Sequence, residues 1–321
     1  MKKTTRILAL LLALCLLFSL AACGKQDTTD VSGEPTTGTD TPEDGNVSDA
    51  QKELKDLQKS MLEKMLSLQQ ENSDTMGWLY IDGTTVDDAV VKVSYNDNNQ
   101  YYLRRNAKGE SDFYGCYFAD HRCYAGDRNS LSKNTVIFGH SMSEDVAGVK
   151  FSQLKKYLKE DFAEEHPYIY FSTIEDDMVW QIFAVFYTNI TFDYIQPNPT
   201  SASFQSLLDT AKSLSFYDYG IEVTPNDKVL TLSTCTYKLA DGTKLSYPNN
   251  YRFVVMAKLI DKDVELQDSV SLKLTKNAPT DAAVSSDDDI WVRNPAIYDN
   301  APRIADHKAY MESFRETKKA S

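Results

Sequence analysis

The most informative stretch of the sequence reads Lys228-Val229-Leu230-Thr231-Leu232-Ser233-Thr234-Cys235. Its apolar and hydroxyl side chains alternate with a period of two, which predicts a β-strand with one face toward a core. Shortly afterwards, Tyr251-Arg252-Phe253-Val254-Val255 predicts another strand, which begins near a cation. Because a nearby cation favours the thiolate form of a cysteine, Cys235 is a candidate nucleophile as well as a candidate packing residue.

Outward from this strand, short strand patterns dominate the chain, with few helices between them. Helical stretches are expected at residues 151–158 and 204–214. The strand candidates are residues 78–81, 89–93, 114–118, 135–138, 168–171, 179–187, 228–234 and 253–260. About eight strands at this spacing predict a mainly β fold, a closed or nearly closed β-barrel with short peripheral helices.

The segment before the first strand predicts an amphipathic helix over residues 49–70. Its apolar side chains repeat at helical spacing, with Lys, Glu and Gln between them: Leu54, Leu57, Met61, Met65 and Leu68. We expect this helix to pack on the domain rather than to bind a partner. At the other end, residues 263–321 carry charge runs and isolated apolar islands, which predict a loosely attached extension of unknown role.

The N-terminus predicts export. Lys2, Lys3 and Arg6 precede an apolar segment over residues 7–20 that is too short for a comfortable membrane span. The sequence Leu20-Ala21-Ala22-Cys23-Gly24 then resembles a bacterial lipobox, which predicts a signal peptide over residues 1–22 and lipidation of Cys23. An uncleaved membrane anchor is the alternative. The composition of residues 23–48, rich in Thr, Asp and Gly, predicts a disordered tether.

The net charge and the cysteines narrow further the class of protein to which this chain can belong. The 321-residue chain has a net charge of −13, which argues against a nucleic-acid partner. Of its five cysteines, Cys15 and Cys23 lie in the predicted signal region, so an odd number remains in the mature chain. Cys116 and Cys123 can pair in an exported protein or stay as free thiols, whereas Cys235 is expected to stay unpaired.

Three candidate functional residues occupy comparable places in the predicted strands. Cys235 ends one strand, Arg252 opens the next, and His140 follows residues 135–138 through Gly139. Antiparallel neighbours bring the end of one strand beside the start of the next, and His140 joins them if its strand points the same way as the Cys strand. A Cys nucleophile, a His acid–base and an Arg that stabilises an oxyanion would together suit acyl transfer.

Several motifs of this chain resemble those of class B sortases, the cysteine transpeptidases of Gram-positive cell surfaces. Thr231-Leu232-Ser233-Thr234-Cys235 matches the TLxTC motif in its class B form. The other matches follow in the family's order from about residue 50 to 260: Asp74-Thr75-Met76-Gly77-Trp78-Leu79-Tyr80-Ile81-Asp82-Gly83-Thr84, Asp97-Asn98 with Tyr102-Leu103, Gly115-Cys116-Tyr117-Phe118, Asn134-Thr135-Val136-Ile137-Phe138-Gly139-His140-Ser141-Met142 and Arg252-Phe253-Val254-Val255.

The resemblance implies an eight-stranded sortase-type β-barrel with N-terminal helices. With it, the expected organisation is an N-terminal helix over residues 49–75, a catalytic domain over 76–262 and the extension over 263–321. The protein would lie at the extracellular face of the cell membrane, held there by a lipid or by an N-terminal anchor.

The resemblance also implies a chemical role for each candidate residue. Cys235 would attack the Thr carbonyl of an NPxT-like sorting signal on a secreted protein, and an amine of a peptidoglycan precursor or a pilin would release the acyl group. His140 would be the acid–base and Arg252 the clamp on the oxyanion or substrate. No cofactor and no metal are implied. The residues expected to bind substrate are Thr234, Ser233, Asn98 and Leu103.

The chain departs from the class B pattern beside the candidate nucleophile. Thr236 stands where many members carry an acid, and Arg252 follows Cys235 by 17 positions, a longer interval than usual. Residues 238–250 therefore predict an enlarged loop beside the site, where it would affect substrate and acceptor specificity. Asp87-Asp88-Ala89 in place of a Tyr-Pro segment, the lipobox and the C-terminal extension are also atypical.

Three alternatives stay open at this point. His121 beside Asp120 is a second candidate base, although its polar turn favours a structural or exposed position. The barrel could be a catalytically silent surface-binding module, in which Cys235 would be as inert as a buried thiol. It could also be a hydrolytic cysteine peptidase, which would give no ligated product with an amine.

Overall fold

The computed structural model describes residues 48–284, apart from 142–143, 145, 147 and 247–248. The predicted signal peptide, Cys23 and nearly all of the predicted tether lie outside the described residues, as does the extension after residue 284. Within the described ranges, none of the helices combines the length and the apolar composition that crossing a membrane requires.

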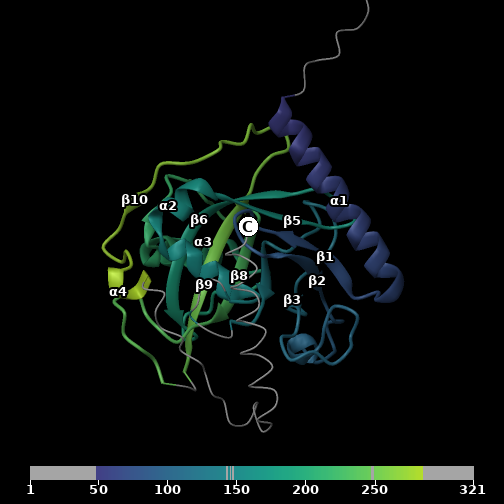
Figure 1. Ribbon diagram of the computed structural model, residues 1–321, viewed down its shortest axis with the longest axis horizontal. Coiled ribbons are helices and arrows are strands. Elements are labelled where there is room, and N and C mark those ends of the chain that lie inside the picture. The colour runs from purple at the N-terminus through teal and green to yellow at the C-terminus, as the bar shows by residue number, and fades with distance from the viewer. Residues whose placement is uncertain (1–47, 142–143, 145, 147, 247–248, 285–321) are drawn as a thin grey trace, which may run out of the picture. The chain divides into compact units, whose positions relative to one another are not determined.

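The predicted barrel is confirmed, with eight strands in one closed sheet (Figure 1). The strands are β1 (Thr75–Tyr80), β2 (Asp87–Val91), β3 (Tyr117–Ala119), β4 (Asn134–Phe138), β5 (Tyr168–Ser172), β6 (Val179–Asn189), β8 (Val229–Cys235) and β9 (Tyr251–Leu259). Around the barrel they follow the order β1-β2-β3-β4-β8-β9-β6-β5, and β5 pairs back onto β1. Two neighbouring pairs are parallel, β2 with β3 and β4 with β8, and the others are antiparallel.

Each of the eight strand candidates of the sequence corresponds to one of these strands. The main differences are at strand ends: residues 114–116 precede β3 rather than belong to it, while Cys235 and Arg252 lie within β8 and β9. The predicted stretches 151–158 and 204–214 form the 3₁₀ helix η2 (Phe151–Leu158) and helix α3 (Ser201–Leu214). Some short elements were not predicted, among them the 3₁₀ helix η1 (Tyr101–Arg104) and helix α2 (Glu160–Glu165).

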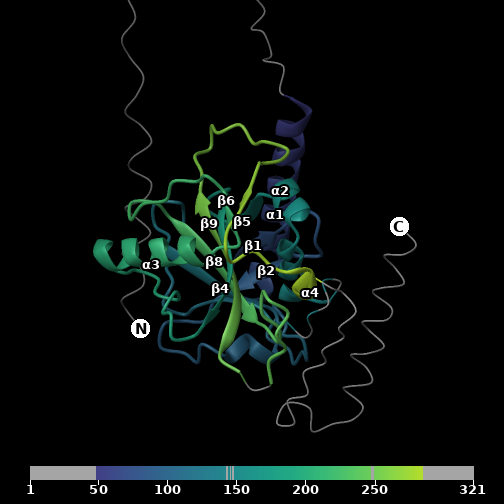
Figure 2. The ribbon, with the colours of Figure 1, turned by 90° about the vertical axis from the view of Figure 1, so that its left-hand side faces the viewer.

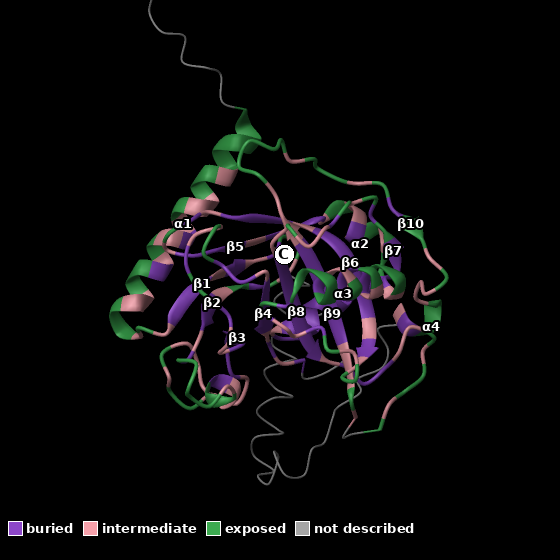
Figure 3. Cartoon of the chain, turned by 180° about the vertical axis from the view of Figure 1, so that it is seen from behind, coloured by how far each residue is buried: buried purple, intermediate pink, exposed green. Residues whose placement is uncertain are grey.

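Helix α1 (Asp49–Glu71) packs on the barrel, as its apolar spacing predicted. Its start is fixed by a capping box, in which Ser48 accepts from the Gln51 amide and the Gln51 side chain accepts from the Ser48 amide. Met61 and Met65 are fully buried against the domain. Figure 3 shows the rest of the helix surface as mostly exposed, and Figures 1 and 2 show α1 and α3 on different sides of the barrel.

The alternation on β8 divides its side chains between two hydrophobic clusters. Leu230 and Leu232 belong to the main core, whereas Val229 belongs with Val254 to a second cluster that includes the buried side of α3. Because strand side chains alternate between faces, Cys235 lies on the face of Val229 rather than on the face that fills the barrel. The thiol is therefore directed to the outside of the main core.

The prediction of a loosely attached C-terminal extension is wrong for residues 270–284. After β9 the chain returns along the left side of Figure 1, where β10 (Lys273–Leu274) pairs with β7 (Tyr217–Asp218) and α4 (Asp281–Val284) follows. Leu272 and Ala283 are 9% and 3% exposed, and Val270 packs against the main core. The packing of these residues could not be predicted, because isolated apolar side chains in a polar segment show no period, and here they fill gaps in a core formed by other elements. We refer to residues 270–284 as the C-terminal strap.

Candidate functional site

Cys235 and Arg252 lie directly opposite each other at one edge of the barrel. They are the last aligned pair of the antiparallel β8–β9 ladder, after Thr234 with Phe253. Aligned residues in neighbouring strands direct their side chains to the same face, so the thiol and the guanidinium share one side of the sheet. Both residues are partly exposed. The arrangement that the sequence predicted for this strand pair is therefore present.

His140 lies at the same edge because β4 runs parallel to β8. This is the strand direction that the prediction required. Phe138 is aligned with Ser233, and the Gly139 amide continues the ladder by donating to the Ser233 carbonyl at 3.3 Å. Two residues beyond this last aligned pair stand His140, just after β4, and Cys235, the last residue of β8. The backbone can follow this path only with glycine at position 139, because a Cβ there would lie 2.6 Å from the Phe151 ring.

His140, Cys235 and Arg252 thus form one row across β4, β8 and β9. Neighbouring strands lie about 4.8 Å apart, so the backbones of the three residues lie near one another at this edge. The backbone of His140 is also held from η2, because the Phe151 amide donates to the His140 carbonyl at 2.9 Å. Three segments that are far apart in the sequence therefore supply one compact set of reactive groups.

The Leu103 carbonyl orients the His140 ring. His140 Nε2 lies 2.8 Å from this oxygen. A carbonyl oxygen can only accept, so Nε2 carries the proton and Nδ1 of the neutral ring is left as an acceptor. Burial and, to a smaller extent, the positive charge of Arg104 lower the pKa of His140 to about 4, although the bond to Leu103 acts to raise it. The free protein therefore holds a neutral imidazole at neutral pH.

The two hydroxyls before Cys235 both make bonds inside the protein. Ser233 Oγ lies 2.8 Å from the Tyr194 hydroxyl, and Thr234 Oγ1 donates to the Gly139 carbonyl at 2.7 Å. Both residues are 3% exposed. These bonds fix β8 against its surroundings, and the Thr234 bond joins it to the segment that carries His140. A role for either residue in substrate binding stays a prediction.

The other two expected substrate-binding residues lie in and before η1. The Asn98 side chain accepts from the Gln100 amide at 3.0 Å, and its carbonyl accepts from Tyr101. Asn98 is exposed and shapes the turn into η1. Leu103 is partly buried and contacts His140 through its carbonyl oxygen. This contact could not be predicted from the sequence, because every residue has a carbonyl oxygen. Contact of either side chain with substrate also stays a prediction.

A buried ion pair supports the chain directly after Cys235. Lys155 Nζ and Glu144 Oε1 are 2.9 Å apart, with side chains 0% and 2% exposed. Lys155 Nζ also donates to the Cys235 carbonyl at 3.4 Å. Glu144 Oε1 accepts from the Thr236 hydroxyl at 3.1 Å and from the Tyr237 amide at 2.7 Å. Because a lone buried charge is strongly unfavourable, the two charged side chains stay paired, and together they hold residues 235–237 in place.

This ion pair was not predicted from the sequence, since its members come from η2 and from the segment after His140. The sequence showed only that Thr236 stands where an acid is usual. In the structure Thr236 is fully buried, and a carboxylate does reach it, from Glu144. No local signal pointed to this contact, because the two residues are brought together only when η2 packs on the end of β8.

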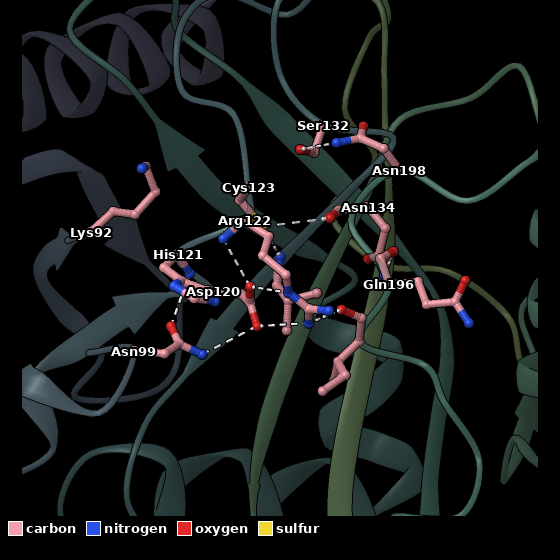
Figure 4. A network of polar contacts seen from close by, with 12 residues as sticks. Lys92, Asn99, Asp120, His121, Arg122, Cys123, Ser132, Asn134, Gln196 and Asn198 are labelled. Atoms are coloured by element: carbon pink, nitrogen blue, oxygen red, sulfur yellow. Dashed lines mark hydrogen bonds and ion pairs between the residues drawn. The ribbon is translucent and has the colours of Figure 1, made fainter. Parts of the chain in front are cut away.

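The alternative base, His121, belongs to a different polar network (Figure 4). The Asp120 carboxylate accepts from Arg122 Nε at 2.8 Å, from Arg122 Nη2 at 3.0 Å and from Asn99 Nδ2 at 3.3 Å. The His121 ring stacks on Tyr95 at 5.5 Å between centroids. Burial acts to raise the pKa of Asp120, but the bonds from Arg122 outweigh it and hold that pKa below its ordinary value. These contacts satisfy the polar groups of the network among themselves, so its role is to stabilise the turn after β3.

The remaining described cysteines are free and buried. Cys116 and Cys123 are each 2% exposed, and burial raises the pKa of both thiols to about 12. Of the two possibilities left open, free thiols are therefore the correct one. Among the residues that the structure describes, no three His, Cys, Asp or Glu side chains are grouped so that they could hold a metal ion.

Comparison with known proteins agrees with this geometry. The model of the sortase domain matches residues 79–260. Sortase B of Listeria monocytogenes serovar 1/2a is 34% identical over 201 residues, which cover 62% of this chain and 75% of that protein. A Staphylococcus aureus sortase B–substrate complex superposes with a TM-score of 0.54 at 26% identity, covering 66% of this chain and 95% of the other.

A further solved structure, a sortase B complexed with triglycine, has a TM-score of 0.53 at 27% identity and covers 66% of this chain and 96% of its own. The matched region contains most of the barrel and the row of His140, Cys235 and Arg252. The chain therefore belongs to the sortase family, in its class B, and is a cysteine transpeptidase.

Proposed function

We propose that Cys235, His140 and Arg252 are the nucleophile, the acid–base and the oxyanion clamp of this transpeptidase. The observation that carries the proposal is their alignment in one row across β4, β8 and β9. A thiol, an imidazole and a guanidinium on one face are the groups that acyl transfer through a thioester requires.

In the first half-reaction the Cys235 sulfur attacks the carbonyl carbon of a peptide bond. His140, whose Nδ1 is left without a proton by the bond from Nε2 to Leu103, takes the thiol proton. The carbonyl oxygen becomes an oxyanion beside the Arg252 guanidinium. When the tetrahedral species collapses, the C–N bond breaks, the imidazolium passes its proton to the leaving amine, and a thioester to Cys235 remains.

In the second half-reaction an amine attacks the thioester carbonyl. His140 removes the proton that the amine loses as the new amide bond forms, and this proton returns to the departing sulfur of Cys235. The low pKa of His140, set first by burial and then by Arg104, keeps the ring able to accept a proton at neutral pH. The cycle ends with the free thiol and neutral imidazole of the starting state.

The substrates that suit this protein are a secreted protein with an NPxT-like sorting signal and an amine of a peptidoglycan precursor or a pilin. Two observations support this choice. One matching structure is a sortase B–substrate complex, and another is a sortase B complexed with triglycine, which carries a free amine. Cys235 and Arg252 are both partly exposed, so a peptide can reach them from solvent.

Sortases act at the cell surface, and we propose that this one is held there through its N-terminus. The basic residues, the apolar segment and Leu20-Ala21-Ala22-Cys23-Gly24 support a lipoprotein signal. The composition of residues 23–48 predicts a tether, and a flexible chain of about 25 residues spans roughly 25–30 Å. Metabolic labelling with a fatty-acid analogue should mark the wild type but not Cys23→Ala, and equal labelling of both would exclude lipidation at Cys23.

The test of the mechanism is capture of the acyl-enzyme. Incubation with an NPxT-type peptide should add the mass of the N-terminal peptide fragment to the wild type, and hydroxylamine should release it. Cys235→Ala should show no adduct and no cleavage. Cleavage by Cys235→Ala at the wild-type rate would overturn the assignment of the nucleophile.

Two measurements separate this function from the alternatives. Adding triglycine should convert the peptide fragment into a ligated product, whereas a hydrolytic peptidase would yield only the free acid. A silent binding module would leave Cys235 as slow to react with iodoacetamide as Cys123. We expect Cys235 to be alkylated much faster, because Cys123 is buried and its thiol pKa is raised to about 12.

A further inference from the structure

Two segments of this chain that depart from the class B pattern contact each other. One is the β8–β9 loop, residues 236–250, which begins directly after Cys235 and is longer than the resemblance predicts. The other is the C-terminal strap, which follows residue 260, where the match to the sortase domain ends. Their contact gives the strap a connection to the active site.

The first half of the β8–β9 loop folds back on itself. The Leu239 amide donates to the Thr243 carbonyl at 2.9 Å, and the Leu245 amide donates to the Tyr237 carbonyl at 2.8 Å. These bonds form a small hairpin that starts two residues after the nucleophile. A hairpin of this size is marginally stable alone in water, so its position depends on what it packs against.

The end of the C-terminal strap packs against this hairpin. The Thr280 amide donates to the Ala240 carbonyl at 2.8 Å, and Lys238 Nζ donates to the Ala282 carbonyl at 3.1 Å. Lys238 is 2% exposed, so its ammonium depends on partners inside the protein. Ala283, next along the strap, is 3% exposed. Lys238 and Ala283 are therefore buried in this contact, whereas Thr280 and Ala282 lie at its exposed rim.

Gly242 shows how closely the two segments approach. Its φ is +85°, in the region that favours glycine, and a Cβ at this position would lie 2.6 Å from the Ala282 Cβ. The tip of the hairpin is thus shaped to the strap, with no room for a side chain between them.

The strap is fixed to the barrel before it reaches the loop. The Thr275 amide donates to the Phe216 carbonyl at 2.9 Å, and Thr275 Oγ1 donates to the Ser215 carbonyl at 2.6 Å. Upstream, β10 pairs with β7 and Leu272 enters the main core. One end of the strap is therefore attached to rigid structure and the other to the loop beside Cys235. Figure 2 shows this side of the molecule toward the viewer, with α4 in front.

We propose that the C-terminal strap is a specificity-determining brace, which fixes the position of the β8–β9 loop beside Cys235. This inference rests on the proposed function of Cys235. Ordering one residue requires about 1–2 kcal/mol of conformational entropy, so a free loop would have to be ordered by each substrate that binds. A loop that the strap already holds in place binds the fitting peptide or amine more tightly and excludes others.

Two pairs of variants in the full chain test the brace. Thr280→Pro removes the amide hydrogen that bonds to Ala240, whereas Thr280→Ser keeps it together with the hydroxyl, which also donates to the Ala240 carbonyl at 3.2 Å. Lys238→Met removes the bond to Ala282 and retains the apolar stem, whereas Lys273→Met makes the same change in the strap at an exposed position away from the loop. We expect Thr280→Pro and Lys238→Met to raise the KM for the sorting peptide roughly 5- to 10-fold, or to shift the ratio of hydrolysis to ligation to triglycine by a similar factor.

Two further readouts separate the brace from a general loss of fold. Hydrogen exchange at the Leu239 and Leu245 amides should become faster in Thr280→Pro and Lys238→Met but not in their matched controls. The rate of Cys235 alkylation by iodoacetamide should stay at the wild-type value in all four variants, because the thiol itself is unchanged.

Each outcome decides the inference. Unchanged exchange in both Thr280→Pro and Lys238→Met would show that the strap does not hold the loop. Faster exchange with wild-type KM and product ratio would show a purely structural contact, and either result overturns the proposal while the function of Cys235 stands. A wild type that neither cleaves nor ligates the peptide would instead overturn the proposed function, and with it the role of the strap in specificity.

Discussion

Two edges of this barrel carry a cysteine, a histidine and an arginine, yet they have opposite characters. At the end of β3, the sequence Asp120-His121-Arg122-Cys123 places all three types in one turn, with the thiol 2% exposed and its pKa raised to about 12 by burial. At the end of β8, Cys235 is partly exposed between His140 and Arg252.

The difference lies in what each side chain already binds. In the β3 turn the carboxylate of Asp120 accepts hydrogen bonds from the side chains of Arg122 and Asn99, and the His121 ring stacks on Tyr95. At the β8 edge, the ring of His140 is oriented through Nε2, which leaves Nδ1 as an acceptor. Residue types that suit catalysis form a stable structural network where they satisfy each other, and a reactive site where they do not.

The largest expected difference between the two edges concerns the thiols. Cys235→Ala should lower kcat/KM for peptide ligation by at least about 10⁴-fold, because the thioester cannot form. Cys123→Ala should retain near wild-type kcat/KM, since that thiol is buried away from the row. The measurement is the rate of ligated product by chromatography. Loss of ligation in a folded Cys123→Ala protein would break the comparison.

The two histidines should differ by a smaller factor. His140→Asn should lower kcat by about 10²–10⁴-fold, the usual contribution of a general acid–base. His121→Asn is the matched change at the β3 turn and should leave kcat unaltered, because its ring faces Tyr95 and the Asp97 carbonyl. Circular dichroism of both variants controls for folding. Equal losses in the two variants would contradict the assignment of His140.

The carboxylate of Asp120 should matter for stability rather than for rate. Asp120→Ala leaves Arg122 and Asn99 without their shared acceptor and should lower the free energy of unfolding by about 3 kcal/mol. Urea denaturation gives this number, and active-site titration gives kcat per folded molecule, which should match the wild type. A stable variant with a much lower kcat would place the β3 turn in the reaction.

The smallest effect is a pH dependence of stability that belongs to His140. Its pKa falls from 6.5 in the unfolded chain to about 4 in the folded protein, so the unfolded state binds the proton more readily. The stabilisation is present above pH 6.5 and is lost as the pH falls toward 4, on the order of 2 kcal/mol between pH 7 and pH 5.

The test measures the free energy of unfolding at several pH values in the wild type and in His140→Asn, which lacks the titrating ring. The wild-type value minus the His140→Asn value should fall as the pH decreases from 7 to 5. A difference that is constant from pH 7 to pH 5 would mean that the His140 ring is not kept neutral by its surroundings.

Local sequence patterns determined most of the secondary structure of this protein. The alternation in residues 228–235 and the enrichment in β-branched and aromatic residues elsewhere indicated all eight barrel strands, because a strand's side-chain period is fixed by its own backbone. Strand ends were predicted less well, as the segment before β3 shows, since an end depends on where pairing with a neighbour stops. The motif around Cys235 and the helical spacing of apolar residues in α1 were equally local signals.

Tertiary structure alone decided which of these segments meet. The parallel pairing of β4 with β8 aligns His140 with Cys235, the Leu103 carbonyl orients the ring, and Glu144 with Lys155 fixes the chain after the nucleophile. The C-terminal strap, which composition indicated to be loose, packs on the β8–β9 loop. Such contacts join residues far apart in the chain through burial and backbone pairing, and neither leaves a period or a motif in the sequence of either partner.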